Sequence, residues 1–177
     1  MKSVTAMVTT AACVAALSLG AAAAQEPNTD KTTYVTFSAP VALPGVTLPP
    51  GDYMFKLLNS QVNRNIVQIF NHDRSKLFAT VVAIPAQRIE VTGETVITFR
   101  ESPAGAPPSV RYWYFPGDKN GQEFAYPVKQ AQELADTNHE AVVGITPTGG
   151  DPSGAKGGEI NRVQPRGDAK KKNPKTP

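Results

Sequence analysis

The sequence predicts an all-β fold: an antiparallel β-sandwich or barrel-like sheet of eight or nine short strands, with one short C-terminal helix. Short runs of β-branched and aromatic residues recur between residues 32 and 126, and Pro, Gly, Asn and Asp separate them. Their regular spacing is typical of a sandwich or a barrel. All thirteen aromatic residues lie between Tyr34 and Tyr126, so we expect the packed core in this part of the chain.

We expect strands at these runs and turns between the strands. The Pro-Gly pairs at 44–45 and 50–51 predict turns around a short extended piece, because proline fixes φ and glycine accepts φ above zero. Hairpin turns are expected at 72–75, 92–93 and 117–121. The predicted strands are residues 34–38, 46–48, 53–58, 66–70, 76–84, 88–91, 95–99 and 110–115, and a last strand through Phe124 and Tyr126.

The helix is expected to follow Pro127 and to end near Asn138. Apolar residues recur there at helical spacing, with polar residues on the opposite face, so the helix should pack one face on the sheet. These apolar residues are Val128, Ala131, Leu134 and Ala135. Residues 66–70 and 78–84 are apolar on both faces, which is typical of strands covered on both sides.

The first 24 residues predict a secretory signal peptide. Lys2 supplies a positive charge, residues 4–19 are weakly apolar, and residues 22–24 form a small-residue cleavage site. An uncleaved anchor is the alternative, although Ala and Thr make this segment a poor membrane span. Cleavage removes Cys13, the only cysteine. The secreted or periplasmic chain is therefore predicted to lack disulfides, thiol chemistry and a transmembrane span.

Two further parts follow the signal peptide. Residues 25–143 are the predicted β domain, with a net charge of −2, and residues 144–177 are a Gly/Pro-rich tail with a net charge of +4. This composition predicts a disordered tail. Its lysines favour attraction to an anionic surface, the alternative being a solvated tail, and no specific nucleic acid is expected. These lysines are Lys170, Lys171, Lys172 and Lys175.

Three motifs resemble those of a family of small, uncharacterised exported bacterial proteins. They are residues 48–53 (LPPGDY), residues 66–71 (IVQIFN), and residues 115–118 (FPGD) with 121–124 (GQEF). The resemblance covers residues 32–127 and implies export and a β fold, with no activity to transfer. The first motif is also loosely similar to the turn into a strand in secreted immunoglobulin-like β-sandwich modules.

No catalytic residue, metal ligand or cofactor is predicted. Only His72 and His139 are present for a Ser/His/acid site or a metal, and we expect the first at a hairpin tip and the second at a helix end. A zinc site using both with a carboxylate stays open. Residues 118–123 space their oxygens like a calcium loop but are too short for one, and a tight turn explains them.

The predicted binding surface is the aromatic strand at residues 110–115. Strand alternation places Tyr112 and Tyr114 on one face and Arg111, Trp113 and Phe115 on the other. One face should be core, and the other, joined by Tyr126, should present rings that stack on sugars. The alternative is that both faces are buried.

Side chains of the polar loop at residues 59–65, above all Asn63 and Arg64, are further candidates to bind sugar hydroxyls, the alternative being an ordinary Asn-rich connecting loop. The sequence thus predicts a non-enzymatic exported binding module, with a glycan or cell-envelope polymer as ligand. One alternative is a structural or interaction protein that assembles through sheet edges. A second is a hydrolase using two carboxylates, although the sequence selects no pair. The available acids are Asp52, Asp73, Glu90, Glu94, Glu101, Asp118 and Glu123.

Overall fold

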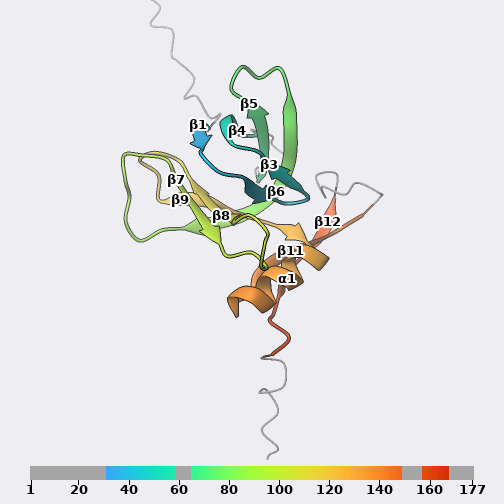
Figure 1. The fold of residues 1–177 in the computed structure, drawn as a ribbon. Coiled ribbons are helices and arrows are strands. Elements are labelled where there is room, and N and C mark those ends of the chain that lie inside the picture. Colours follow the sequence, from blue (N-terminus) through green and yellow to red (C-terminus); the bar gives the residue numbers. More distant parts are fainter. Residues whose placement is uncertain (1–30, 59–64, 149–156, 168–177) are drawn as a thin grey trace, which may run out of the picture.

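The computed structural model describes residues 31–58, 65–148 and 157–167, and most of its strands form one large sheet (Figure 1). The sheet has nine strands in the order β1-β4-β5-β6-β9-β8-β2-β3, with β7 paired to β8. The β-rich prediction is therefore confirmed. The strands are β1 (Thr32–Phe37), β2 (Val41–Leu43), β3 (Val46–Leu48), β4 (Gly51–Leu57), β5 (Ile66–Asn71), β6 (Leu77–Gln87), β7 (Val96–Arg100), β8 (Ser109–Tyr114) and β9 (Asn120–Phe124).

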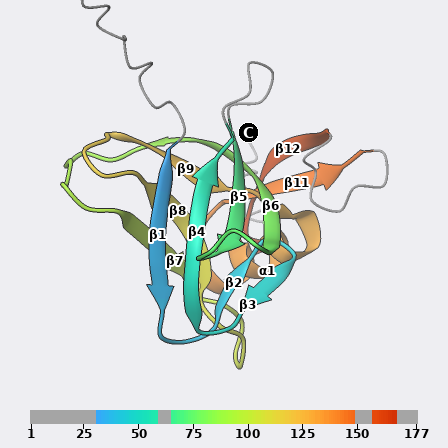
Figure 2. The same ribbon diagram turned by 90° about the horizontal axis from the view of Figure 1, so that it is seen from above.

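The large sheet curls over on itself because the long strand β6 serves two partners. Its first half pairs with β5 as far as Val82, and its second half pairs with β9 from Ala83 onward. Figure 2 shows the strands wrapping around a common interior. The sheet does not close into a barrel, because β1 pairs only with β4 and β7 only with β8 among the described strands. The prediction of an antiparallel two-sheet sandwich is therefore wrong in detail: the large sheet is a single curled, open sheet, and it is mixed, because β2 pairs parallel with β8.

Aromatic side chains fill the interior of this curled sheet. Phe55 stacks on Phe124 with ring centroids 6.3 Å apart and meets the edge of Trp113 at 6.0 Å. The indole Nε1 of Trp113 donates to Thr33 Oγ1 at 3.0 Å, which satisfies a buried donor. Burial of each such ring contributes about 2–3 kcal/mol. The aromatic residues therefore form the core in the part of the chain where the sequence predicts it.

A second, smaller sheet packs with the helix beside the first. β10 (Tyr126–Pro127), α1 (Val128–Asn138) and β11 (Val142–Pro147) form a parallel strand-helix-strand unit, and β12 (Gly158–Val163) pairs antiparallel with β11. Ala131, Leu134 and Ala135 are the buried face of the helix, as predicted, whereas Val128, which was expected on the same face, is exposed. No helix within the described residues is long and apolar enough to cross a membrane.

The prediction of a wholly disordered tail from residue 144 is wrong, because β11 and β12 lie in that segment. Two glycines allow these strands to approach closely: a Cβ on Gly144 would lie 2.6 Å from Val163, and one on Gly158 would lie 2.8 Å from Ile145. The average composition of residues 144–177 does not reveal that two strands within this segment pack together. Residues 1–30 and 168–177, which include the predicted signal peptide and the four lysines, lie outside the described residues.

The predicted strand at residues 88–91 is also wrong, and so is the hairpin at 92–93. Residues 88–95 form a loop in which Ile89 is 97% exposed. Arg88 holds the loop through its guanidinium, which donates to Asp118 O at 2.9 Å and to Thr92 Oγ1 at 2.9 Å. These side-chain hydrogen bonds hold the loop in place, although it pairs with no described strand. The hairpin turns after β5 and after β8 are confirmed.

Candidate functional site

Three of the four aromatic residues expected to bind sugar lie in the interior. Trp113, Tyr114 and Tyr126 are 2%, 5% and 0% exposed, so no sugar ring can stack on them in this structure. Burial raises the pKa of Tyr126 far above its ordinary value, and its hydroxyl donates to Val110 O at 2.6 Å. The Arg88 guanidinium lies 5.2 Å from the Tyr114 ring centre and covers it. Only Tyr112 stays partly exposed.

A β-bulge at Arg111 changes which side chains share a face of β8. Thr98 pairs with Tyr112 and Phe99 with Val110, so Arg111 has no opposite residue on β7. The bulge places the Arg111 guanidinium over the Tyr112 ring, 4.7 Å from its centre. The expected grouping of Arg111 with Trp113 is therefore wrong. The arginine occupies a ring face on which a sugar would stack.

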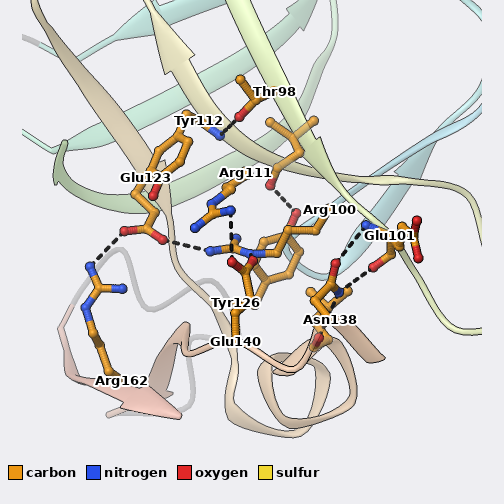
Figure 3. Close-up of polar contacts among 12 residues, drawn as sticks. Thr98, Arg100, Glu101, Arg111, Tyr112, Glu123, Tyr126, Asn138, Glu140 and Arg162 are labelled. Carbon is orange, nitrogen blue, oxygen red and sulfur yellow. Dashed lines mark hydrogen bonds and ion pairs between the residues drawn. The ribbon is translucent and has the colours of Figure 1, made fainter. Parts of the chain in front are cut away.

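Five charged side chains form an ion ladder beside this bulge (Figure 3). In order they are Arg162, Glu123, Arg100, Glu140 and Arg111, with alternating sign. Glu123 accepts from Arg162 Nη2 at 2.9 Å and from Arg100 Nη2 at 2.7 Å. Glu140 accepts from Arg100 Nε at 2.8 Å and from Arg111 Nη1 at 3.0 Å. The ladder joins β7, β8 and β9 to the loop after α1 and to β12.

The ion ladder links the two sheets through paired charges. The side chains of Arg100 and Glu123 are 1% and 2% exposed, and buried charges persist only where they are paired. Each glutamate in the ladder accepts from two guanidinium groups. Arg100 Nη1 and Arg111 Nε have no hydrogen-bond partner within the described chain. Glu101 and Glu140 line the cleft beside these arginines, which leaves it without excess positive charge.

The two histidines lie where the sequence predicts them. His72 is in the turn between β5 and β6, and its ring packs 5.0 Å from that of Tyr34. His139 is the left-handed residue that ends α1, with φ of 52°. In the part of the chain that the structure describes, no three His, Cys, Asp or Glu side chains gather as metal ligands.

A groove that sequence analysis missed lies between the edge strands β1 and β7. We call it the seam; it is lined by Tyr34, Val35, Thr36, Phe37, Thr95, Ile97 and Phe99. At one end the rings of Phe37 and Phe99 meet edge to face at 6.2 Å. Val35 and Ile97 also pack against the main core, so the seam opens onto the apolar interior. It is the place where the curled sheet fails to close.

The seam leaves both backbone edges and apolar side chains open to solvent. Tyr34 is 52% and Phe99 42% exposed. Because each of the two strands pairs on one side only within the described chain, the other side presents main-chain N–H and C=O groups. No local signal in the sequence reveals the seam, since residues 38–95 separate β1 from β7 and the two strands are brought together only by the strand order.

The remaining predicted ligand residues, Asn63 and Arg64, lie outside the described residues. Comparisons with protein families, with curated proteins and with solved structures find no match to this chain. The resemblance to small exported bacterial proteins therefore stays a prediction.

Proposed function

We propose that this protein is an exported, non-catalytic binding module that takes an extended segment of a partner polypeptide into the seam. The single observation that carries the proposal is a pair of edge strands facing each other across an apolar groove. An added strand would satisfy main-chain groups along the sheet edge and would cover the opening to the core. Export is inferred from the signal peptide predicted at residues 1–24.

The chemistry of the seam favours a segment with alternating apolar and polar residues. Side chains on one face of the added strand would meet Val35, Phe37, Ile97 and Phe99. Each apolar side chain that becomes fully buried contributes about 1.5–3 kcal/mol, and ordering the segment costs about 1–2 kcal/mol per residue. These opposing terms support a moderate affinity, with a dissociation constant on the order of micromolar.

A polypeptide fits the geometry better than a glycan does. The predicted sugar platform retains only Tyr112, and Arg111 already lies over that ring. The seam, in contrast, offers both backbone groups and apolar surface. Assembly of identical copies through their edges is the alternative occupant, and a concentration-dependent mass in light scattering would reveal it.

The test is selection of displayed ten-residue peptides by the purified protein. The library carries apolar residues at alternate positions, and a matched scrambled library has the same composition without alternation. We expect alternating peptides to be selected, and Phe99→Lys to lower their affinity at least tenfold. Ile89→Lys is the control, since Ile89 is an exposed apolar residue outside the seam lining. Equal selection from both libraries, or binding unchanged by Phe99→Lys, overturns the proposal.

A further inference from the structure

Arg74 has an unusual backbone conformation in the turn between β5 and β6. Its φ is +65°, in the left-handed region that favours glycine and costs other residues about 1–2 kcal/mol. Asn71 and Asp73 hold the turn by accepting backbone N–H groups from Lys76 and Ser75. A glycine would adopt this conformation without the energetic cost. The presence of an arginine at this position therefore suggests that its side chain has a role beyond the turn.

That side chain crosses the outer face of β4 and ends at the edge of the sheet. Arg74 Nε donates to Met54 Sδ at 3.1 Å, and Arg74 Nη2 donates to Tyr34 Oη at 3.2 Å. Tyr34 pairs with Met54 across β1 and β4, and Tyr34 lines the seam. The His72 ring packs against Tyr34 from the same turn. The turn thus delivers a guanidinium to the rim of the seam.

The guanidinium of Arg74 has no carboxylate partner within the described part of the chain. The nearest acid in sequence, Asp73, accepts the Ser75 N–H, and this hydrogen bond lowers its pKa. Two residues further along β1 the charge is reversed, because Thr36 donates to the Asp52 carboxylate at 2.6 Å. The outer rim of β1 is therefore cationic beside Tyr34 and anionic beside Thr36.

We propose that the seam selects segments with an acidic side chain on the outward face, at the position beside Tyr34. This inference rests on the proposed strand addition. The carboxylate would accept from the free guanidinium N–H groups of Arg74 and from the Tyr34 hydroxyl, which itself accepts from Arg74. The occupant is thus an extended acidic segment of another polypeptide.

Segments of this chain outside the structure do not match that description. Residues 1–24 and 59–64 contain no acidic residue, and residues 25–30, 149–156 and 168–177 contain no Val, Ile, Leu or Phe. None of them combines an apolar alternation with a carboxylate. The charge and the apolar lining together fit an acidic segment of another polypeptide. Ile89, Glu90 and Val91 of a second copy form an exposed run of this pattern, and a mass in light scattering that rises with concentration would identify a second copy as the occupant instead.

The test uses a second displayed library with Val, Ile or Phe at alternate positions and equal Glu, Lys and Thr at the others. We expect the selected peptides to show about fivefold more Glu than Lys at one outward position, as for an exposed ion pair. The Arg74→Gln variant should lose this enrichment. Arg166→Gln is the control, because it removes a positive charge from an exposed side chain outside the seam lining.

The outcomes separate the two proposals. Alternating peptides selected with equal Glu and Lys, or a Glu enrichment that persists in Arg74→Gln, overturn the acidic preference and leave strand addition standing. Failure to select any alternating peptide overturns strand addition, and the acidic preference falls with it. A urea titration of Arg74→Gln confirms that the variant is folded.

Discussion

Phe99 and Arg100 are neighbours on β7, yet they belong to opposite kinds of surface. Arg100 is buried in the ion ladder, where its guanidinium binds Glu123 and Glu140. Phe99 stands half-exposed in the seam, with no strand beyond it in the described chain. Where the large sheet meets the small one, charged side chains are paired, and two of them, Arg100 and Glu123, are buried. At the seam, where no described strand covers the sheet edge, apolar groups and backbone stay open, and this contrast is the basis of the proposal that the seam binds a partner.

The largest effect is expected from breaking the ladder. Glu123→Ala leaves Arg100 without one of its two carboxylates in a buried site, and we expect the free energy of unfolding to fall by about 3–5 kcal/mol. Urea denaturation measures it. Arg162→Ala removes the exposed member of the ladder and should cost less than about 1 kcal/mol. If the two variants are equally stable, the ladder does not hold the two sheets together.

A smaller effect is expected from the buried side-chain hydrogen bond that joins β1 to β8. Thr33→Val leaves the Trp113 Nε1 donor without its acceptor, which should cost about 1–3 kcal/mol in urea denaturation. Thr36→Val, on the exposed face of the same strand, should change stability by about 0.5 kcal/mol or less. Equal losses would mean that this hydrogen bond does not anchor β1.

Relieving the backbone at Arg74 should leave stability almost unchanged. In Arg74→Gly the left-handed conformation no longer carries a cost, while the contacts to Met54 and Tyr34 are lost and the unfolded chain gains freedom. We expect the free energy of unfolding to stay within about 1 kcal/mol of the native value. A larger loss would mean that Arg74 serves the fold rather than the rim of the seam.

The smallest effect concerns the ion pair of Lys31 and Asp118, which ties the start of β1 to the turn after β8. The hydrogen bond from Lys31 is the main reason that the pKa of Asp118 lies below its ordinary 3.8. The ion pair therefore stabilises the fold above about pH 4, and this contribution is lost as the pH falls through the lowered pKa. In thermal melts, Asp118→Asn should differ from the native protein at pH 6 and match it at pH 2. A constant difference would contradict this.

Local patterns predicted the helix and most strands between residues 32 and 126, because these elements depend on neighbouring residues, but they missed β2, β11 and β12. The helix from Val128 to Asn138 and the turns around His72 and Asp118 follow from apolar spacing and from turn chemistry. The run at residues 88–91 has the same composition as a strand, but Arg88 anchors it through side-chain bonds to distant carbonyl groups. Those bonds leave no local signal in the sequence.

The ion ladder and the seam could not be predicted either, because their residues are far apart in the sequence. Arg100 and Glu123 are 23 residues apart, and Arg162 is 39 residues beyond Glu123. The aromatic run at residues 112–114 indicated a surface, but the bulge at Arg111 and the cover from Arg88 leave only Tyr112 partly exposed. The seam depends on which strands fail to pair, and only the strand order reveals it.

Hydrogen exchange of the backbone amides tests the central claim most directly. In the free protein, amides of β1 and β7 that do not bond to β4 or β8 should exchange rapidly. Adding a selected alternating peptide should slow exchange of these amides, while the amides of β11 and β12 stay unchanged. Exchange that is unaltered in β1 and β7 at saturating peptide, with protection appearing elsewhere, would contradict strand addition at the seam.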